Sequence, residues 1–370
     1  MTFNSYFPRP STPKTPPAVL PPVWEGARGY ADGPGGSALF NAPEGVAVDA
    51  FGNVYVADTS NNLIRKITPV GTVTTLAGLD GKPGTADGKG SLARFNSPRG
   101  IAVDRLGQLY IADTLNNRIR KITLKGGVTT LAGSGARGSD NGRGAEAAFN
   151  NPTGVAVDVP GNVYVADEGN NLIRKITVDG RVSTWAGSGL QGHANGKGID
   201  ASFAHPLGVA ADSGGNVYIA DEVSEQVRKI DREDEVTTLA GQAGKTGSTD
   251  GKGADVLFCY PGGITADLKG NLYITDRGTN LIRKMNEGGR VTTMAGSGSV
   301  GFADGKGASA LFHHPSGIAV DASGNVYIAD QENCMIRKVT PQGEVTTLAG
   351  GGAVRPTADQ RMPQGSKHNP

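Results

Sequence analysis

The sequence has few of the residues that usually mark a redox centre or an aromatic binding site. It contains two cysteines, two tryptophans and five methionines in 370 residues, and aromatic residues make up 6% of the chain. Two cysteines, Cys259 and Cys334, are too few for a disulfide framework. Their number fits a reducing compartment but does not establish one.

The chain also lacks net charge and long apolar runs. Its net charge is +1, so no global field attracts nucleic acid or anionic lipid, and binding to either would need a local patch. No window of 18 apolar residues exists, which excludes a membrane-spanning helix. The first 22 residues contain seven prolines and no apolar core of a signal peptide. The compartment is therefore unknown, and a secreted or periplasmic location is expected only if a signal has been removed.

Glycine is abundant instead, with 57 residues, about twice the usual frequency. A phrase that begins with Phe and contains Pro-x-Gly occurs six times, as FNAPEG (40–45), FNSPRG (95–100), FNNPTG (149–154), FAHPLG (203–208), FCYPGG (258–263) and FHHPSG (312–317). The aspartates that follow are spaced by 54 or 55 residues, at Asp49, Asp104, Asp158, Asp212, Asp267 and Asp321. Such a period indicates a repeat architecture.

Each copy carries four short phrases rich in Val, Ile, Tyr and Thr. In copy one they are GVAVD (45–49), GNVYVAD (52–58), NNLIRKI (61–67) and GTVTTLAG (71–78). This pattern predicts four strands joined by tight turns. The first strand is apolar at nearly every position, so both of its faces need cover, which a closed ring of sheets provides. The sequence therefore predicts an all-β, six-bladed β-propeller of four-stranded antiparallel blades.

The run PxGVAVDxxGNVYVADxxNNxIRKIxxxGxVTTLAG closely resembles the NHL repeat, over residues 40–350. The resemblance implies the same propeller, but its functions range over RNA-binding modules, protein-docking modules, extracellular sensors and a zinc-dependent amidating lyase. We expect a propeller over residues 23–352, a Pro-rich disordered tail or linker over 1–22, and a disordered tail over 353–370. Copy six is expected to use its own fourth strand (344–350), with Val23 and Trp24 on the outer edge or competing for that place.

Most charges repeat with the strands, and we interpret them structurally. The aspartate that ends the second strand is expected to pair with the arginine of the IRK phrase across the hairpin, as Asp58 with Arg65. A basic residue recurs in the loop between copies, at Lys89, Arg143, Lys197, Lys252 and Lys306. We interpret these residues as a solvated face, with a nucleic-acid-binding ring as the alternative. Their DGxG phrase lacks the further oxygen ligands of a calcium loop.

A ring of equal copies can hold one ligand specifically only where the copies differ. The differences gather in copies four to six, in the FNxP phrase and in the loop between the second and third strands. The residue after each proline is expected at the mouth of the central channel. The candidate ligand-binding residues are His205, Tyr260, His313, His314, Arg277, Glu222, Arg99 and Glu44. The post-proline positions carry no histidine, so the zinc site that the resemblance implies is not transferred.

Three functions follow, in order of preference. The first is a monomeric, non-enzymatic scaffold that binds a protein or a small-molecule ligand on one loop face, without a cofactor and without a membrane or nucleic-acid partner. The second is a hydrolase or lyase at the channel mouth, with a divalent metal on His205, His313 or His314 and Glu222 as base. Cys259 would be a nucleophile only with a lowered pKa and a nearby base. The third is nucleic-acid binding through the basic loops.

Overall fold

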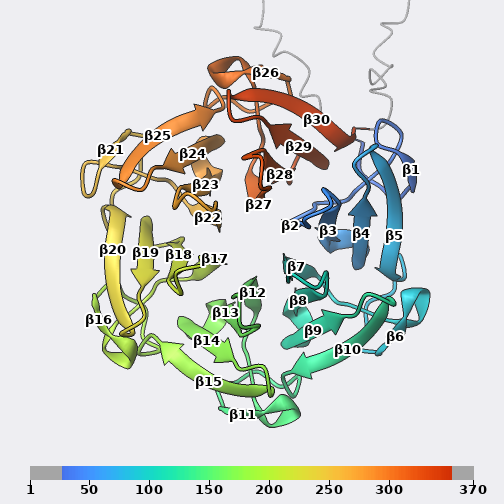
Figure 1. The fold of residues 1–370 in the computed structure, drawn as a ribbon, viewed down its shortest axis with the longest axis horizontal. Helices are drawn as coiled ribbons and strands as arrows, with labels where there is room; N and C mark the ends of the chain where they lie inside the picture. The colour runs from blue at the N-terminus through green and yellow to red at the C-terminus, as the bar shows by residue number, and fades with distance from the viewer. Residues whose placement is uncertain (1–26, 352–370) are drawn as a thin grey trace, which may run out of the picture.

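The computed structural model describes residues 27–351, which form six antiparallel sheets arranged as blades around a central axis (Figure 1). Blade 1 contains β1 (Gly33–Pro34), β2 (Gly45–Val48), β3 (Val54–Asp58), β4 (Leu63–Ile67) and β5 (Thr72–Gly78). Blade 2 contains β6 (Gly88–Lys89), β7 (Pro98–Val103), β8 (Leu109–Asp113), β9 (Arg118–Ile122) and β10 (Gly127–Ala132). Blade 3 contains β11 (Gly142–Arg143), β12 (Pro152–Val157), β13 (Val163–Asp167), β14 (Leu172–Ile176) and β15 (Arg181–Ala186).

The second half of the ring repeats this order. Blade 4 contains β16 (Gly196–Lys197), β17 (Pro206–Ala211), β18 (Val217–Asp221), β19 (Gln226–Ile230) and β20 (Glu235–Gly241). Blade 5 contains β21 (Gly251–Lys252), β22 (Pro261–Ala266), β23 (Leu272–Asp276), β24 (Leu281–Met285) and β25 (Arg290–Ala295). Blade 6 contains β26 (Gly305–Lys306), β27 (Pro315–Val320), β28 (Val326–Asp330), β29 (Met335–Val339) and β30 (Glu344–Gly350).

Short 3₁₀ turns connect some of these strands. They are η1 (Thr59–Asn61), η2 (Gly90–Leu92), η3 (Thr114–Asn116), η4 (Gly144–Glu146), η5 (Glu168–Asn170), η6 (Gly198–Asp200), η7 (Arg277–Thr279) and η8 (Gly307–Ser309). The turns η1, η3, η5 and η7 join the second and third of the four long strands. The turns η2, η4, η6 and η8 follow the two-residue strands.

The predicted propeller of six blades is confirmed, but the prediction of four strands per blade is wrong by one. Two residues of each inter-blade loop pair antiparallel with the start of the outermost long strand, as Lys89 with Gly127. A strand of two residues is too short to produce a visible periodicity, and Gly88 has a φ of 148° that glycine tolerates well. This fifth strand covers part of the sheet edge and so reduces edge-to-edge pairing.

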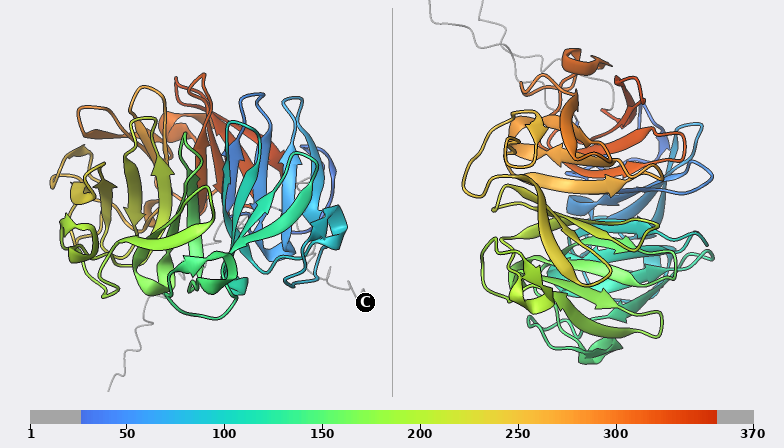
Figure 2. Two further views of the ribbon diagram at one scale, coloured as in Figure 1. Left: turned by 60° about the horizontal axis from the view of Figure 1, so that its bottom comes forward. Right: turned by 60° about the vertical axis from the view of Figure 1, so that its left-hand side comes forward.

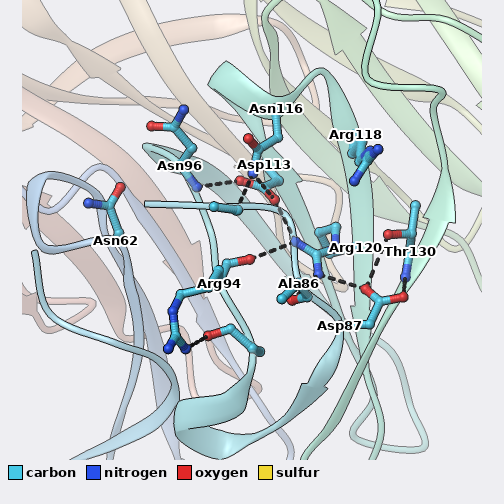
Figure 3. Close-up of polar contacts among 12 residues, drawn as sticks. Asn62, Ala86, Asp87, Arg94, Asn96, Asp113, Asn116, Arg118, Arg120 and Thr130 are labelled. Atoms are coloured by element: carbon cyan, nitrogen blue, oxygen red, sulfur yellow. Dashed lines mark hydrogen bonds and ion pairs between the residues drawn. The ribbon is translucent and has the colours of Figure 1, made fainter. Parts of the chain in front are cut away.

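The expected aspartate–arginine pair is present in every blade. In blade 2 the fully buried Arg120 donates Nη1 to Asp113 Oδ2 at 2.7 Å and Nη2 to Asp87 Oδ1 at 2.7 Å (Figure 3). Asp87 also accepts from the Thr130 backbone N–H of β10. The equivalent inner pairs are Asp58–Arg65, Asp167–Arg174, Asp221–Arg228, Asp276–Arg283 and Asp330–Arg337. The aspartate or asparagine of the DGKG-type loop therefore serves as an arginine acceptor inside the blade.

The core lies in the seams between adjacent blades. In the first seam, Tyr55 and Ile64 of blade 1 pack with Phe95 and Ile111 of blade 2, all of them buried. The closing seam is built in the same way, with Phe40 of the first repeat against blade 6. Blade 6 uses its own fourth long strand, β30, as expected. Val23, Trp24 and the tails predicted at 1–22 and 353–370 lie outside the described residues.

The glycine of Pro-x-Gly sits where neighbouring blades approach most closely. A side chain on Gly100 would collide with the backbone carbonyl of Thr153, and one on Gly317 with that of Glu44. The obstacle in both cases is backbone, which cannot move aside. The repeated glycine is thus explained by the crowding of the first strands around the axis.

Candidate functional site

The first strands of all six blades converge on a narrow mouth at one end of the central channel. The cavity there has a volume of about 90 Å³ and is lined mainly by glycine, valine and isoleucine. The charged residues among its lining are Glu44, Arg99 and Arg277. The cavity is therefore an apolar funnel with charges at its entrance.

A second ring of positions surrounds this mouth, one residue after the aspartate that ends each second long strand. In blades 1 and 2 the position holds Thr59 and Thr114, which are buried and donate to the carbonyls of Pro98 and Pro152 at 2.8 Å. In blades 3 to 6 it holds Glu168, Glu222, Arg277 and Gln331. The same backbone position thus changes from an inter-blade hydrogen bond to a set of longer polar side chains.

These side chains form polar contacts with the residues that follow or precede the prolines. The contacts fall into two groups, which we call arcs. In the first arc, Arg99 Nε lies 3.2 Å from Glu44 Oε2, and Arg99 Nη1 lies 3.9 Å from Glu168 Oε2. His205 Nδ1 lies 3.2 Å from Glu168 Oε1. We call Glu44, Arg99, Glu168, His205, Glu222, Arg277 and His314 the rim.

The second arc is centred on Arg277. Its Nη1 donates to Glu222 Oε1 at 2.8 Å, and its Nη2 lies 3.5 Å from His314 Nδ1. A side chain at Gly262 would collide with the Arg277 side chain, so the absence of one there lets the arginine extend over the mouth. Gly262 is the glycine among the six post-proline residues. Blade 5 thus supplies its rim charge from the loop rather than from the post-proline position.

The rim carboxylates are more buried than free carboxylates prefer. Burial raises the pKa of Glu44, and the charge of Arg99 opposes this effect. Burial also raises the pKa of Glu222, and Arg277 opposes it. Burial, together with Arg277, lowers the pKa of His314 and so favours the neutral imidazole. The rim therefore holds three acidic side chains and two arginines in partly dehydrated surroundings.

The pre-proline residues share a backbone role that does not depend on their side chains. His205, Tyr260 and His314 all have positive φ angles near 55°. Their backbone N–H groups donate to Asn171, Glu225 and Asn280 of the preceding blade at 3.0, 2.6 and 2.8 Å. We call this hydrogen bond, present in each seam, the inter-blade clasp. The exchange of residue type at this position leaves the clasp intact.

The structure brings six of the eight candidate residues together on the rim, namely Glu44, Arg99, His205, Glu222, Arg277 and His314. Tyr260 is 47% exposed and contributes its backbone N–H, which donates to Glu225, to the inter-blade clasp. His313 donates its backbone N–H to Asp330 at 2.8 Å, a structural bond that Asn41 and Asn96 make in their own blades. Ligand binding by any of the eight stays a prediction.

Sequence reasoning missed Glu168 and the role of Glu225. Glu168 lies in copy three, outside the copies in which the differences gather, although its replacement of Thr59 and Thr114 was a visible signal. Glu225 occupies the left-handed position that asparagine holds in four other blades, with φ of 58°, and is 4% exposed. Burial raises its pKa to about 7. The side chain at that position accepts the hydrogen bond of the clasp. Sequence periodicity does not reveal this role.

The remaining candidates for chemistry lie apart from the rim contacts. Burial raises the pKa of the Cys259 thiol, and the nearby Glu225 raises it further, which works against a nucleophilic role. Within residues 27–351 no three His, Cys, Asp or Glu side chains come together in a way that could hold a metal ion. The basic loop residues lie on the two-residue outer strands, as Lys89 on β6, at the outside of the disc. No helix in the described part of the chain is long and apolar enough to cross a membrane.

Comparison with known sequences identifies the repeat. The model of the NHL repeat matches residues 40–67, 95–122, 149–176 and 312–338. The chain is 33% identical to the protein SUPPRESSOR OF QUENCHING 1, chloroplastic, of Arabidopsis thaliana over 85% of its length, and 30% identical to NHL repeat-containing protein 2 of Bos taurus over 80%. It spans 32% of the first relative and 46% of the second.

Solved structures show the same fold at low identity. An auxiliary nutrient binding protein from Bacteroides thetaiotaomicron aligns with a TM-score of 0.64 at 18% identity, over 88% of this chain and 75% of that one. Virginiamycin B lyase from Staphylococcus aureus aligns with a TM-score of 0.51 at 15% identity, over 83% and 84%. Similarity at this level concerns architecture alone. With the repeats, the six blades and the relatives in agreement, the chain belongs to the NHL-repeat β-propellers.

Proposed function

We propose that this propeller is a non-enzymatic binding scaffold whose channel mouth receives a positively charged group of a protein partner. The observation that carries the proposal is the rim itself. The repeated aspartates and arginines pair inside the blades, whereas the charged residues that replace Thr59 and Thr114 gather around the mouth.

The sign of the ligand follows from the balance of rim charges. Glu44, Glu168 and Glu222 face two arginines, and burial favours the neutral form of the histidine His314. A guanidinium or ammonium group would restore interactions that Glu44 and Glu222 lose on leaving water. A carboxylate or phosphate would instead meet like charges.

The size of the cavity favours a side chain over a whole small molecule. Pockets for drug-sized ligands measure roughly 300–1,000 Å³, whereas the mouth has about 90 Å³. A lysine or arginine side chain can place its charged end there while the rest of the partner lies on the rim. That division of contacts is typical of a protein interface with one anchoring side chain.

A fluorescent glycine peptide with one central lysine tests the proposal, with the norleucine peptide as its uncharged control. Fluorescence anisotropy should show tighter binding of the lysine peptide, and E44Q or E222Q should weaken it about fivefold, since each removes a charge-assisted contact. The exposed Glu233, on the other side of the disc, supplies the matched control E233Q, which should bind like the wild type. Equal binding of both peptides, or no loss in the rim variants, would refute the proposal.

A further inference from the structure

The end of the disc opposite the mouth carries exposed apolar side chains on one half. Each blade has two turns there. The inner turn joins its first and second long strands, and the outer turn joins its third and fourth. In blades 1 to 3 these turns present six side chains with exposed fractions of 48–88%, namely Phe51, Val70, Leu106, Leu124, Val159 and Val178. We call these six residues the apolar crescent.

The crescent is continuous within a blade and stands out from the disc. A Cβ on Gly107 would lie 2.9 Å from Leu124 Cδ2, so the outer turn of blade 2 leans on the inner turn beside Leu106. The equivalent contact in blade 3 places Val178 Cγ1 3.2 Å from a Cβ on Gly161. Figure 2 shows the hairpins projecting side by side as separate tips along one side of the disc. The six apolar side chains thus lie on neighbouring turns and are exposed to solvent.

The charges of these turns divide the face into two halves. Apart from the repeated aspartate that opens each inner turn, blades 1 to 3 carry three basic residues and one acidic residue, a balance of +2: Arg105, Lys125, Arg181 and Asp179. Blades 4 to 6 carry three basic and six acidic residues, a balance of −3: Arg232, Lys269, Arg290, Asp231, Glu233, Asp234, Glu235, Glu287 and Glu344. Both halves carry three basic residues, so they differ in their acidic residues, and the apolar crescent lies on the less acidic half.

A second copy of the chain does not suit this surface. A two-fold axis through the crescent would place Arg105 and Lys125 of one copy opposite the same residues of the other, with like charges in contact. Packing the crescent of one copy against blades 4 to 6 of the other would bury acidic side chains against apolar ones. The surface needs a partner that is apolar inside and negatively charged outside.

We propose that the apolar crescent docks the propeller on an anionic lipid bilayer. Isolated apolar tips enter the boundary between headgroups and acyl chains, while neighbouring basic side chains contact anionic headgroups. The acidic turns of blades 4 to 6 would be repelled, which tilts the disc so that blades 1 to 3 enter first. In this orientation the channel mouth faces away from the bilayer and stays open to its ligand.

Sedimentation with lipid vesicles tests this docking. The protein should partition onto vesicles of phosphatidylcholine mixed with phosphatidylserine, and much less onto phosphatidylcholine alone. The double variant L106S/L124S should partition about tenfold less, because two buried aliphatic side chains are lost. The variant R105Q/K125Q should lose about 25-fold on the anionic vesicles, at roughly fivefold per charge, and nothing on the neutral ones.

Two control variants make the test specific. Leu268, in blade 5, is 80% exposed on the same face but outside the crescent, and L268S should bind like the wild type. R277A alters the mouth and should also leave vesicle binding unchanged, so a failed ligand and a failed docking remain distinguishable. No partition onto anionic vesicles, or equal partition of the crescent variants and the wild type, would overturn the proposal and leave the crescent to a protein partner.

Discussion

The two ends of the channel are built from different turns, each repeated in all six blades, and they differ in what replaces the repeat. At the mouth, the position after the strand-ending aspartate passes from buried Thr59 and Thr114 to charged Glu222 and Arg277, and these charges contact one another. At the opposite end, the turns keep their hydrogen bonds while their tips become apolar in blades 1 to 3 and acidic in blade 4. The repeated fold therefore tolerates change at both ends, even where a side-chain hydrogen bond between blades, as that of Thr59 or Thr114, is given up.

The repeated aspartate–arginine pairs inside the blades form the frame of the propeller. Comparing this frame with the rim predicts that replacing two arginines, one from each, changes the free energy of unfolding by very different amounts. Arg120 is fully buried and pairs with fully buried Asp113, whereas Arg277 and Glu222 keep 15% and 19% of their side-chain area exposed. R120M leaves a buried carboxylate without its partner and should lower the free energy of unfolding by about 3–5 kcal/mol. R277M should cost about 1 kcal/mol or less, because water can reach Glu222. Urea unfolding of both variants measures the difference, and equal losses would show that the rim is part of the frame.

A second contrast lies between the seams. Glu225 accepts the clasp bond from Tyr260 in the seam between blades 4 and 5, where the next seam uses Asn280. Glu222, Asp276 and the Cys259 thiol are its titratable neighbours. Because burial raises the pKa of Glu225 from 4.5 to about 7, the folded state binds its proton more tightly than the unfolded state.

The direction of the pH effect follows from that difference. Glu225 makes a contribution to the free energy of unfolding that is fully present below pH 4.5. This contribution is lost as the pH rises to about 7, by up to about 3 kcal/mol. E225N, which restores the asparagine of four other blades, should remove this dependence and raise the melting temperature at pH 8 more than at pH 5. Thermal unfolding of the two proteins across this range is the measurement. Parallel curves for E225N and the wild type would show that Glu225 does not titrate in the seam.

The sequence was sufficient for the ring, because the period of 54 or 55 residues, the apolar first strand and the paired Asp58 and Arg65 are all local or repeated signals. The fifth strand was missed because two residues have no period. For the candidate site, variation among copies marks Glu222 and Arg277, which contact each other in the structure. The sequence could not show that the space at Gly262 lets Arg277 extend over the mouth, or that Glu168 links Arg99 to His205. Both arrangements depend on contacts between residues far apart in the chain.

The smallest predicted effect concerns the seam that closes the ring. Four clasps have an asparagine as acceptor, as Asn117 Oδ1 for Asn151 N–H at 3.0 Å, but between blades 6 and 1 the acceptor is the Cys334 sulfur, 3.5 Å from Ala42 N. A thiol is a weak acceptor, and Cys334 also holds a φ of 54°, which asparagine tolerates better. C334N should therefore stabilise the fold by about 0.5–1 kcal/mol, and N117C should destabilise it by a similar amount. Urea unfolding of the pair provides the measurement, and a loss of stability in C334N would mean that the closing seam has a geometry of its own rather than that of the other five.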